Sequence, residues 1–470
     1  MSFFHGVKIE RVSDGFVTIP VTTASVIGLI GIAPQGPINE PILVQSKQAA
    51  AQFGLQVPGF GIPKALNAFF QNGASTFIVV NVFNPDTMTA TEEDEEQEVV
   101  NGQYQLDFAP IGNAIVVTNM AGDTTYVDGT HYTFDAFGLV TIIDRVTIPD
   151  GTDLKTTYDR LDATLVTSAA VIGEVDSANN RTGLEAFDNA YNLFGFRPRI
   201  FTSWNYSEVP VISAAMIAKA AEMNGFAMVD ADPDTTLSQA IAGRATAGIG
   251  FDTASQDAAL CYPAGRAKNT KTDAVETVPF GPFLAAVWAR TIANEGFWVS
   301  PSNKAVSGLV GLAQPISYDP FSDTTDANTL NAAGIVTAVT AFGQGIKTWG
   351  NRNASFPSAA GALTFLSVQM AQKIIGESVQ LASINFIDRP INLAFIDSVL
   401  ESVNAFLRGL IGEGAIIDGE CSFDPQKNPP AQIADGKIVF DLVFMPPTPA
   451  EQIVFQKFID INLLQSLIEA

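Results

Sequence analysis

Short apolar β-type runs alternate with helical stretches along most of this chain, and one long acidic segment interrupts the alternation. Two β-type runs, Ser25–Ile32 and Thr76–Val82, precede the interruption, and three more follow it at Arg199–Ser203, Phe226–Val229 and Ala258–Tyr262. Continuous Val- and Ile-rich runs of this length are typical of strands that are buried on both faces. The pattern predicts an α/β fold with a mostly parallel sheet, into which a second unit is inserted.

Helical stretches separate these strands. The clearest is Val211–Asn224, in which Ile212, Met216, Ala220 and Met223 recur with a helical period and share one face. The expected helices are Ser46–Phe53, Pro63–Asn72, Glu185–Phe194, Val211–Asn224, Leu237–Ala242, Phe283–Glu295, Ile335–Phe342 (followed by a turn at Gly343–Gly345), Ala362–Ala382 and Leu393–Leu410.

The interrupting segment differs from the rest in charge and in pattern. Between Pro85 and Asn180 there are 18 acidic and three basic residues, a balance of −15 in a chain whose net charge is −24. Its acidic run Thr91–Glu98 is interpreted as a solvated linker. Turn residues separate the short strands that are expected at Gln103–Phe108, Ala114–Thr118, His131–Phe134, Leu139–Ile143, Thr156–Tyr158 and Thr164–Val166. This segment is therefore predicted to be an inserted all-β domain.

Composition excludes several classes of function. With 25 basic against 49 acidic residues, the chain repels phosphate backbones, so binding to nucleic acid is not expected. Charged residues make up only 16%, which is low and leaves ample apolar surface for subunit interfaces. No secretion signal and no apolar run of membrane-spanning length is found, so direct membrane insertion is not expected. Cys261 and Cys421 are expected to be buried free thiols.

Candidate chemistry is sparse. His5 and His131 are the only histidines, which argues against a His-based metal site or catalytic triad. Asp230, Asp232 and Asp234 form the best carboxylate cluster, directly after a strand, where a metal-dependent α/β enzyme would place ligands. Loop solvation, with Asp234 as the N-cap of the next helix, is the favoured interpretation. Neither an enzymatic activity nor a cofactor is expected.

Two arginines, at Arg197 and Arg199, flank the start of a β-type run. Such a pair could bind an anion, but in an acidic protein salt bridges between subunits are the favoured interpretation.

Both ends of the chain have the pattern of extended segments. Phe16–Ile19 is a β-type run without a local partner, and Ile438–Phe444 is a strand that prolines follow. The final apolar run, Ile453–Leu464, fits two patterns. Val454, Phe458 and Ile461 match one face of a helix, whereas Ile453, Phe455, Ile459 and Ile461 match one face of a strand, with Lys457 as the exception. Its β-branched and aromatic content favours the strand.

Several motifs resemble a known family. The stretch Gly296–Gly311 is similar to a signature of contractile tail sheath proteins from bacteriophages, and Asn331–Ile335 and Thr348–Arg352 continue the similarity. The opening His5–Val7 and the ending Pro449–Ile453 also resemble that family. The resemblance covers about three quarters of the chain. One departure is the uncharged segment 353–363, where many sheath proteins are basic.

The resemblance implies a virion component that polymerises as hexameric rings, stacked helically around a tail tube, with baseplate and tail terminator proteins as further partners. Assembly would take place in the host cytoplasm. Contraction from a metastable extended state would drive the tube through the host envelope without nucleotide hydrolysis. A non-contractile tube or capsid protein is the alternative. Arms from neighbouring subunits would exchange strands through Phe16, Val17, Thr18, Ile19, Ile438, Phe440, Leu442, Phe444, Ile453, Phe455, Ile459 and Ile461. The candidate tube-facing residues are Glu377, Glu401 and Arg408.

These observations predict five parts of the chain. They are an N-terminal arm (1–24), an α/β core (25–84 and 181–352), an inserted, outward-facing β-domain (85–180), a C-terminal inner domain of two helices and strands (353–445) and a C-terminal arm (446–470).

Overall fold

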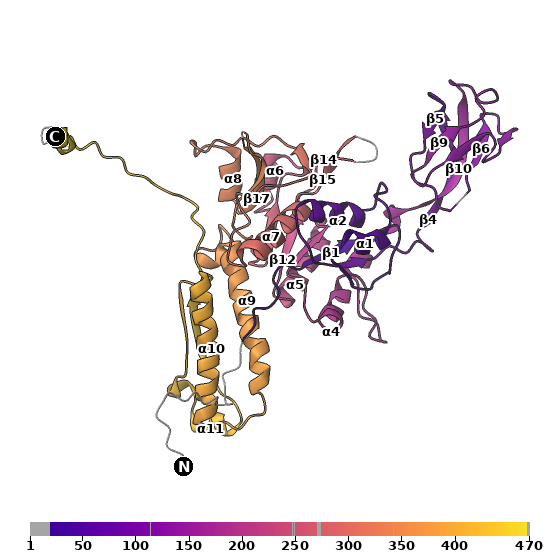
Figure 1. Cartoon of the computed structure of the whole chain (residues 1–470). Helices are drawn as coiled ribbons and strands as arrows, with labels where there is room; N and C mark the ends of the chain where they lie inside the picture. The colour runs from indigo at the N-terminus through magenta and orange to yellow at the C-terminus, as the bar shows by residue number, and fades with distance from the viewer. Residues whose placement is uncertain are drawn as a thin grey trace, which may run out of the picture.

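An eight-stranded mixed sheet forms the centre of the molecule (Figure 1). The computed structural model describes residues 19–112, 114–246, 248, 250–269, 274–341 and 343–467. The strand order is β18-β17-β13-β12-β11-β1-β3-β2, in which the six inner strands run parallel and the two edge strands antiparallel. The strands are β1 (Ile27–Gly31), β2 (Ile42–Val44), β3 (Phe77–Asn81), β11 (Ile200–Ser203), β12 (Phe226–Asp230), β13 (Ala258–Cys261), β17 (Ile335–Ala341) and β18 (Gly345–Trp349). The predicted, mostly parallel sheet is confirmed.

Helices cover both faces of this sheet. One face packs against α2 (Ile62–Gln71) and α7 (Gly281–Glu295), and the other against α5 (Pro210–Glu222). The remaining core elements are α1 (Lys47–Ala50), η1 (Ala51–Phe53), η3 (Gly183–Asn189), α4 (Ala190–Phe194), α6 (Leu237–Ala242), α8 (Asp326–Ala332) and the small sheet of β14 (Gly265–Lys268), β15 (Val275–Val278) and β16 (Leu309–Leu312).

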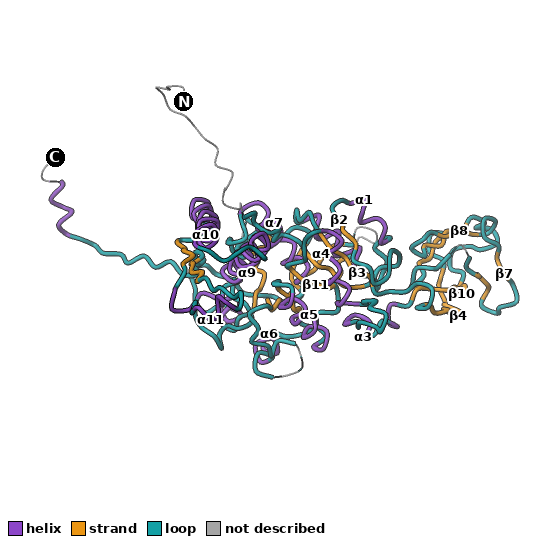
Figure 2. Tube along the Cα trace, turned by 90° about the horizontal axis from the view of Figure 1, so that it is seen from below, coloured by secondary structure: helices purple, strands orange, loops and turns teal. Residues whose placement is uncertain are grey.

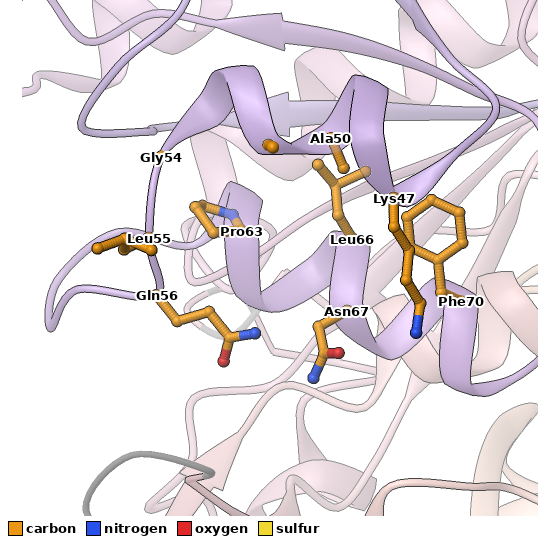
Figure 3. A pocket seen from close by; sticks show the side chains of 10 residues that line it. Lys47, Ala50, Gly54, Leu55, Gln56, Pro63, Leu66, Asn67 and Phe70 are labelled. Atoms are coloured by element: carbon orange, nitrogen blue, oxygen red, sulfur yellow. The ribbon is translucent and has the colours of Figure 1, made fainter.

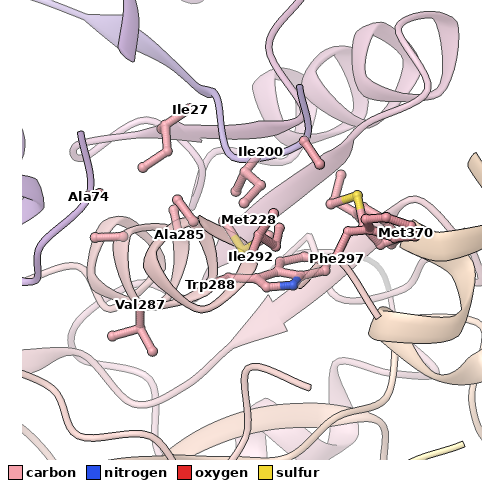
Figure 4. Close-up of a cluster of buried hydrophobic side chains, with 14 of the residues drawn as sticks. Ile27, Ala74, Ile200, Met228, Ala285, Val287, Trp288, Ile292, Phe297 and Met370 are labelled. Carbon is pink, nitrogen blue, oxygen red and sulfur yellow. The ribbon is translucent and has the colours of Figure 1, made fainter. Parts of the chain in front are cut away.

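Helix α7 is buried along most of its length. Its Trp288 is fully buried and lies 4.9 Å from Phe226, ring centre to ring centre. Figure 4 shows Trp288 among Ile27, Ile200 and Met228, which three neighbouring strands contribute. Successive strand residues face opposite sides of the sheet, so the large core cluster forms on one face and two smaller clusters form on the other.

The predicted helix at Ile335–Phe342 is wrong, because this stretch forms strand β17; Phe342 itself lies outside the described residues. Its first five residues are all buried, between β13 on one side and β18 on the other. β-Branched residues dominate the strand and suit this doubly buried position. The turn at Gly343 then leads directly into β18.

Strands β4 to β10 form a β-unit with a core of its own. It contains a sheet of β4 (Thr89–Glu98), β10 (Asp153–Leu161), β6 (Val116–Asn119) and β7 (Thr125–Tyr126), and a second sheet of β5 (Gln103–Gln105), β9 (Leu139–Ile142) and β8 (Tyr132–Phe134). The buried residues Tyr104, Val117, Leu154 and Tyr158 belong to its separate cluster. Figure 1 shows the β-unit at one end of the molecule, connected to the core through β4 and β10.

The interpretation of Thr91–Glu98 as a solvated linker is wrong, because this acidic run lies within strand β4. Its partner β10 carries the bases that make the pairing possible. Lys155 lies 3.2 Å from Asp94, and Arg160 lies 3.0 Å from Glu92. Opposite charges across the strands offset the repulsion between the carboxylates.

The predicted strand at Thr164–Val166 is also wrong. A 3₁₀ turn, η2 (Ala163–Leu165), begins there because the Asp162 side chain accepts a hydrogen bond from Thr164 N at 3.0 Å. Together with α3 (Ser168–Ile172) it packs against the core cluster beside α5. The sheets of the β-unit therefore end well before Asn180.

The C-terminal third contains a helical hairpin, which is formed by α9 (Leu366–Ser383) and α10 (Leu393–Glu413). Its buried residues continue the large core cluster without a break. The elements around the hairpin are η4 (Ala362–Thr364), η5 (Ile384–Phe386), β19 (Asp418–Ser422), η6 (Pro425–Lys427), α11 (Pro430–Ala434) and β20 (Asp441–Met445).

The C-terminal arm, residues 446–467, follows β20. It has no regular structure up to the short 3₁₀ helix η7 (Ile461–Leu467), and it extends away from the body at the end opposite to the β-unit (Figures 1 and 2). No helix in the described ranges has both the length and the hydropathy that crossing a bilayer requires.

Candidate functional site

The C-terminal arm exposes a row of large apolar side chains. Ile453 is 70% exposed, Phe455 83% and Ile459 fully, and every residue from 450 to 464 is exposed. Residues 453–460 form neither helix nor strand, and Ile461 begins η7. The expectation that this segment is a strand stays a prediction, because a strand needs a partner and the structure contains a single subunit.

The predicted strand at Ile438–Phe444 is partly wrong. Leu442 and Phe444 lie in β20, which pairs antiparallel with β19, but Ile438 and Phe440 precede the strand. The reason is the Asn428 side chain. Its Oδ1 accepts from Val439 N at 2.7 Å and its Nδ2 donates to Val439 O at 2.9 Å, so both backbone groups of Val439 already have partners. Strand pairing therefore starts only at Asp441.

Ile438 and Phe440 instead line a cavity of about 600 Å³ beside the loop of the helical hairpin, together with Phe386 and Phe395. The neighbouring sheet contains only β19 and β20 in the described chain, and Val443 in β20 is 68% exposed. This corner of the subunit thus combines an apolar cavity with a short sheet, which is a suitable surface for strand addition.

Of the N-terminal arm residues, Phe16, Val17 and Thr18 lie outside the described residues, as does His5. Ile19 is buried in the large core cluster. Three residues later, Thr22 N donates a hydrogen bond to Ser378 Oγ of α9 at 3.1 Å. The described chain therefore begins against the helical hairpin.

The prediction that Glu377 is an exposed, tube-facing residue is wrong, because Glu377 pairs with a buried residue of its own chain. Its carboxylate forms an ion pair with the guanidinium of Arg199, a fully buried residue directly before β11. Arg199 Nη1 also donates to Met223 O at 2.5 Å. The expected salt bridge of Arg199 between subunits is therefore replaced by one within the chain.

A second ion pair joins α9 to the sheet. Lys373, one helical turn before Glu377, pairs with Asp257, and its Nζ donates to Gly225 O at 2.6 Å. Lys373 and Glu377 are four residues apart on α9 and lie on the face that also carries Met370. Charged residues on the apolar face of a helix are the sequence signal that could have indicated these two ion pairs. By contrast, Glu401 and Arg408 pair with each other at 2.6 Å on the exposed face of α10.

Asp230 is a buried structural residue. Its Oδ1 accepts from Gly281 N at the start of α7 at 2.6 Å, and its Oδ2 accepts from Ser207 Oγ at 2.8 Å. A Cβ at Gly281 would lie 2.4 Å from Asp230 Oδ2, so only glycine fits there. Asp230 thus connects a loop, a strand and a helix.

The other two aspartates of the cluster lie in the loop after β12. Asp232 Oδ1 accepts from Asp234 N at 2.9 Å. The N-cap of α6 is Thr236, which forms a capping box with Gln239, so the assignment of Asp234 as N-cap is wrong. Within the described ranges, no three His, Cys, Asp or Glu residues are grouped as metal ligands would be.

Glu208 lies near Asp230, and its Oε2 is buried without a hydrogen-bond partner in the structure. Burial, with the charges of Asp230 and Asp232 adding to it, raises the pKa of Glu208 from 4.5 to about 7. Burial also raises the pKa of Asp230, from 3.8 to about 6. A carboxyl group whose pKa is raised by folding stabilises the fold while it is protonated, and that contribution is lost as pH rises through the folded pKa.

We therefore expect the free energy of unfolding to increase by about 1–2 kcal/mol between pH 8 and pH 6, which urea titrations at each pH would measure. Glu208→Gln should remove most of this increase, because its neutral amide has no proton to gain. The exposed Glu40→Gln should retain the increase. An equal pH dependence in the wild type and Glu208→Gln would contradict the assignment.

The remaining candidates offer no catalytic set. Cys261 and Cys421 are buried free thiols, as expected. His131 Nδ1 accepts from Val127 N at 2.9 Å within the β-unit. A cavity of about 260 Å³ lies between α1, η1 and α2, and Lys47 is the one charged residue among those that line it (Figure 3). These residues do not combine a nucleophile with a base.

Comparisons with known proteins agree with the sequence resemblance. A family model described as the phage tail sheath protein central domain matches residues 179–354. The tail sheath protein of Burkholderia phage BcepMu is 37% identical over 99% of this chain and 98% of its own length. A putative prophage major tail sheath protein of Pseudomonas aeruginosa (strain UCBPP-PA14) is 27% identical over 96% of this chain and 95% of its own length.

The fold is also similar to a solved sheath structure. The helical sheath of the anti-feeding prophage in its contracted state matches with a TM-score of 0.60 and 15% identity, covering 98% of this chain and all of that chain. At this identity the likeness concerns the fold.

Proposed function

Because this chain belongs to the phage tail sheath protein family, we propose that it is the subunit of a contractile sheath, which polymerises as hexameric rings stacked helically around a tail tube. The observation that supports this proposal best is the exposed apolar arm. A chain that exposes Ile453, Phe455 and Ile459 together in water needs a partner to cover them. Fully burying each such side chain contributes about 1.5–3 kcal/mol.

The proposed role of the arm is to add a strand to a neighbouring subunit near its β19–β20 sheet, where Phe16–Thr18 of a third subunit also binds, while Ile19 stays buried in its own core. Backbone hydrogen bonds of this kind depend little on side-chain packing between bodies. The links therefore persist while the bodies rotate. Contraction then proceeds downhill from a metastable extended state, without nucleotide hydrolysis, and drives the tube through the host envelope.

The partners proposed for this subunit are other copies of itself, the tail tube protein, and the baseplate and tail terminator proteins. The particle is assembled in the host cytoplasm, and the subunit then resides in the virion tail. Glu401 and Arg408, on the exposed face of α10, are the remaining candidates for contact with the tube. We infer that the chain is neither an enzyme nor a cofactor-binding protein, because Asp230 is used in packing and the other candidates form no catalytic set.

The β-unit is proposed to be a separate domain on the outside of the sheath. Its ends meet at the core, because Thr89 pairs with Leu161 and Asp162 N donates to Met88 O at 2.9 Å. Replacing Ala90–Arg160 with an Asn-Gly turn should therefore preserve both folding and polymerisation, since a two-residue turn closes a paired hairpin. Electron microscopy should show sleeves with a smaller outer diameter. Cooperative unfolding of this variant would show that it is folded. If the folded variant formed no polymers, the proposed outward position of the β-unit would be contradicted.

Electron microscopy of the purified wild-type protein tests the proposed function as a whole. A contractile sheath subunit should form hollow sleeves with helical striations, and the sleeves should enclose tube protein when the two are mixed. The non-contractile alternative predicts closed shells or tubes that show one constant diameter and helical pitch under all conditions. A protein that stays monomeric at high concentration would contradict both.

A further inference from the structure

The root of the C-terminal arm is bonded to the body at Glu451. Arg352 Nε donates to Oε1 of Glu451 at 2.9 Å, and Arg352 Nη2 donates to Oε2 at 2.5 Å. Two parallel hydrogen bonds between a guanidinium and a carboxylate fix the relative orientation of the groups as well as their distance. The pair joins residues that are 99 positions apart in the sequence.

Arg352 is itself held in place by its surroundings. Its guanidinium carbon lies 3.6 Å from the ring centre of Phe365 and 4.7 Å from that of Phe356, and its Nη1 donates to Thr364 Oγ1. The Arg352 side chain is only 16% exposed. Stacking on aromatic rings restricts the orientation of the guanidinium plane. The guanidinium of Arg352 therefore has a fixed orientation, and so does the carboxylate that it binds.

The chain between β20 and Glu451 is stiff. Three of its residues are prolines, Pro446, Pro447 and Pro449, whose rings fix the backbone angle φ. Ahead of the prolines, Ile417 N donates to Met445 O at 2.7 Å. The segment is thus held at both ends, and its last residues, Pro449–Glu451, form one wall of a cavity of about 400 Å³ whose other lining residues include Ser302, Asn303 and Asn351. Beyond it, residues 452–460 are all exposed.

We propose that the Arg352–Glu451 pair is a latch that sets the direction in which the arm leaves the subunit, so that the arm is presented to a second copy of the chain. This proposal rests on the proposed function, in which a neighbouring subunit takes up the arm. A fixed direction excludes arm orientations in which a neighbouring subunit could not bind the arm. The entropy cost of ordering the arm on association is therefore lower. Glu451 is 43% exposed, so salt weakens the latch.

Spin-label distances test the latch in the monomer, independently of any assembly. Labels are attached at Ser358→Cys on the body and Gln456→Cys on the arm, both exposed positions, while Cys261 and Cys421 are buried. We expect a narrow distance distribution with native Glu451 and one at least twice as broad with Glu451→Lys. Glu295→Lys is the matched control, because Glu295 pairs with Lys304 at a similar exposure of 46%.

Light scattering then measures the consequence for assembly. At low salt, Glu451→Lys should lengthen the lag before sleeves form by about tenfold, Glu451→Gln should have an intermediate lag, and Glu295→Lys should match the wild type. Added salt should lengthen the lag of the wild type more than that of Glu451→Lys.

Two results would overturn the proposal. An unchanged distance distribution in Glu451→Lys would show that Arg352 does not direct the arm, and a broad distribution with an unchanged lag would show that the direction has no effect on assembly. A wild-type protein that forms no sleeves would contradict the proposed function instead, and the distance distributions would still decide whether the latch exists.

Discussion

A chain that ends after Glu451 should fold normally but form no sleeves. Residues 452–464 are exposed, so their removal takes no packing from the core. Each inserted strand would make several backbone hydrogen bonds at about 0.5–1.5 kcal/mol each, so one arm contributes only a few kcal/mol after the cost of ordering it. In the proposed sheath this link is repeated at every subunit, so its removal should abolish polymers completely rather than weaken them.

Electron microscopy and thermal unfolding together measure this outcome. The midpoint temperature of unfolding should stay within about one degree of that of the full chain, because the truncation leaves the contacts within the core unchanged. A chain that ends after Leu464 is the control, since it retains the apolar residues of the arm and should still polymerise. Normal sleeves from the shorter chain would refute the proposed role of the arm.

Loss of the Glu377 carboxylate should destabilise the subunit by about 3–5 kcal/mol, because the charge of Arg199 would remain buried without a counter-charge. Glu377→Leu tests this by urea unfolding. The matched control is Glu401→Leu, which breaks the exposed pair with Arg408 and should cost less than about 1 kcal/mol.

A double variant separates the ion pair from general packing. Arg199→Met with Glu377→Leu removes both charges and replaces them with apolar side chains, so it should recover much of the lost stability. If Glu377→Leu and Glu401→Leu had equal effects, Glu377 would not be a buried partner of Arg199.

The elements that the sequence predicted correctly are those that local patterns determine. Strand β12 has a clear apolar run and helix α5 a clear apolar stripe, and both ends of each element agree with the predicted range to within two residues. The stretch Ile335–Phe342 failed because a short apolar run fits a buried strand and a buried helix equally well. Only its neighbours, β13 and β18, decide between the two.

Other errors arose where a distant partner determines the structure. Thr91–Glu98 becomes a strand because Lys155 and Arg160 lie opposite it, and Glu377 is buried because Arg199 meets it. Neither partner is visible in a local window of sequence. The arm is a further case, since its proposed strand would form only with another molecule. Sequence reasoning could place it at the surface, but it could not detect that Arg352 holds its root.

The position of β1 in the sheet also affects how the chain folds during synthesis. β1 lies between β3 and β11, and β11 begins only at Ile200. At about 5–20 residues per second, the ribosome needs on the order of ten seconds to make the chain from β1 to β11. During that time one edge of β1 remains unpaired and open to aggregation. The β-unit, whose strands all lie between Thr89 and Leu161 and pair with one another, is complete before Ile200 is made and can fold in the interval. Chaperone demand should therefore be highest before Ile200 has emerged.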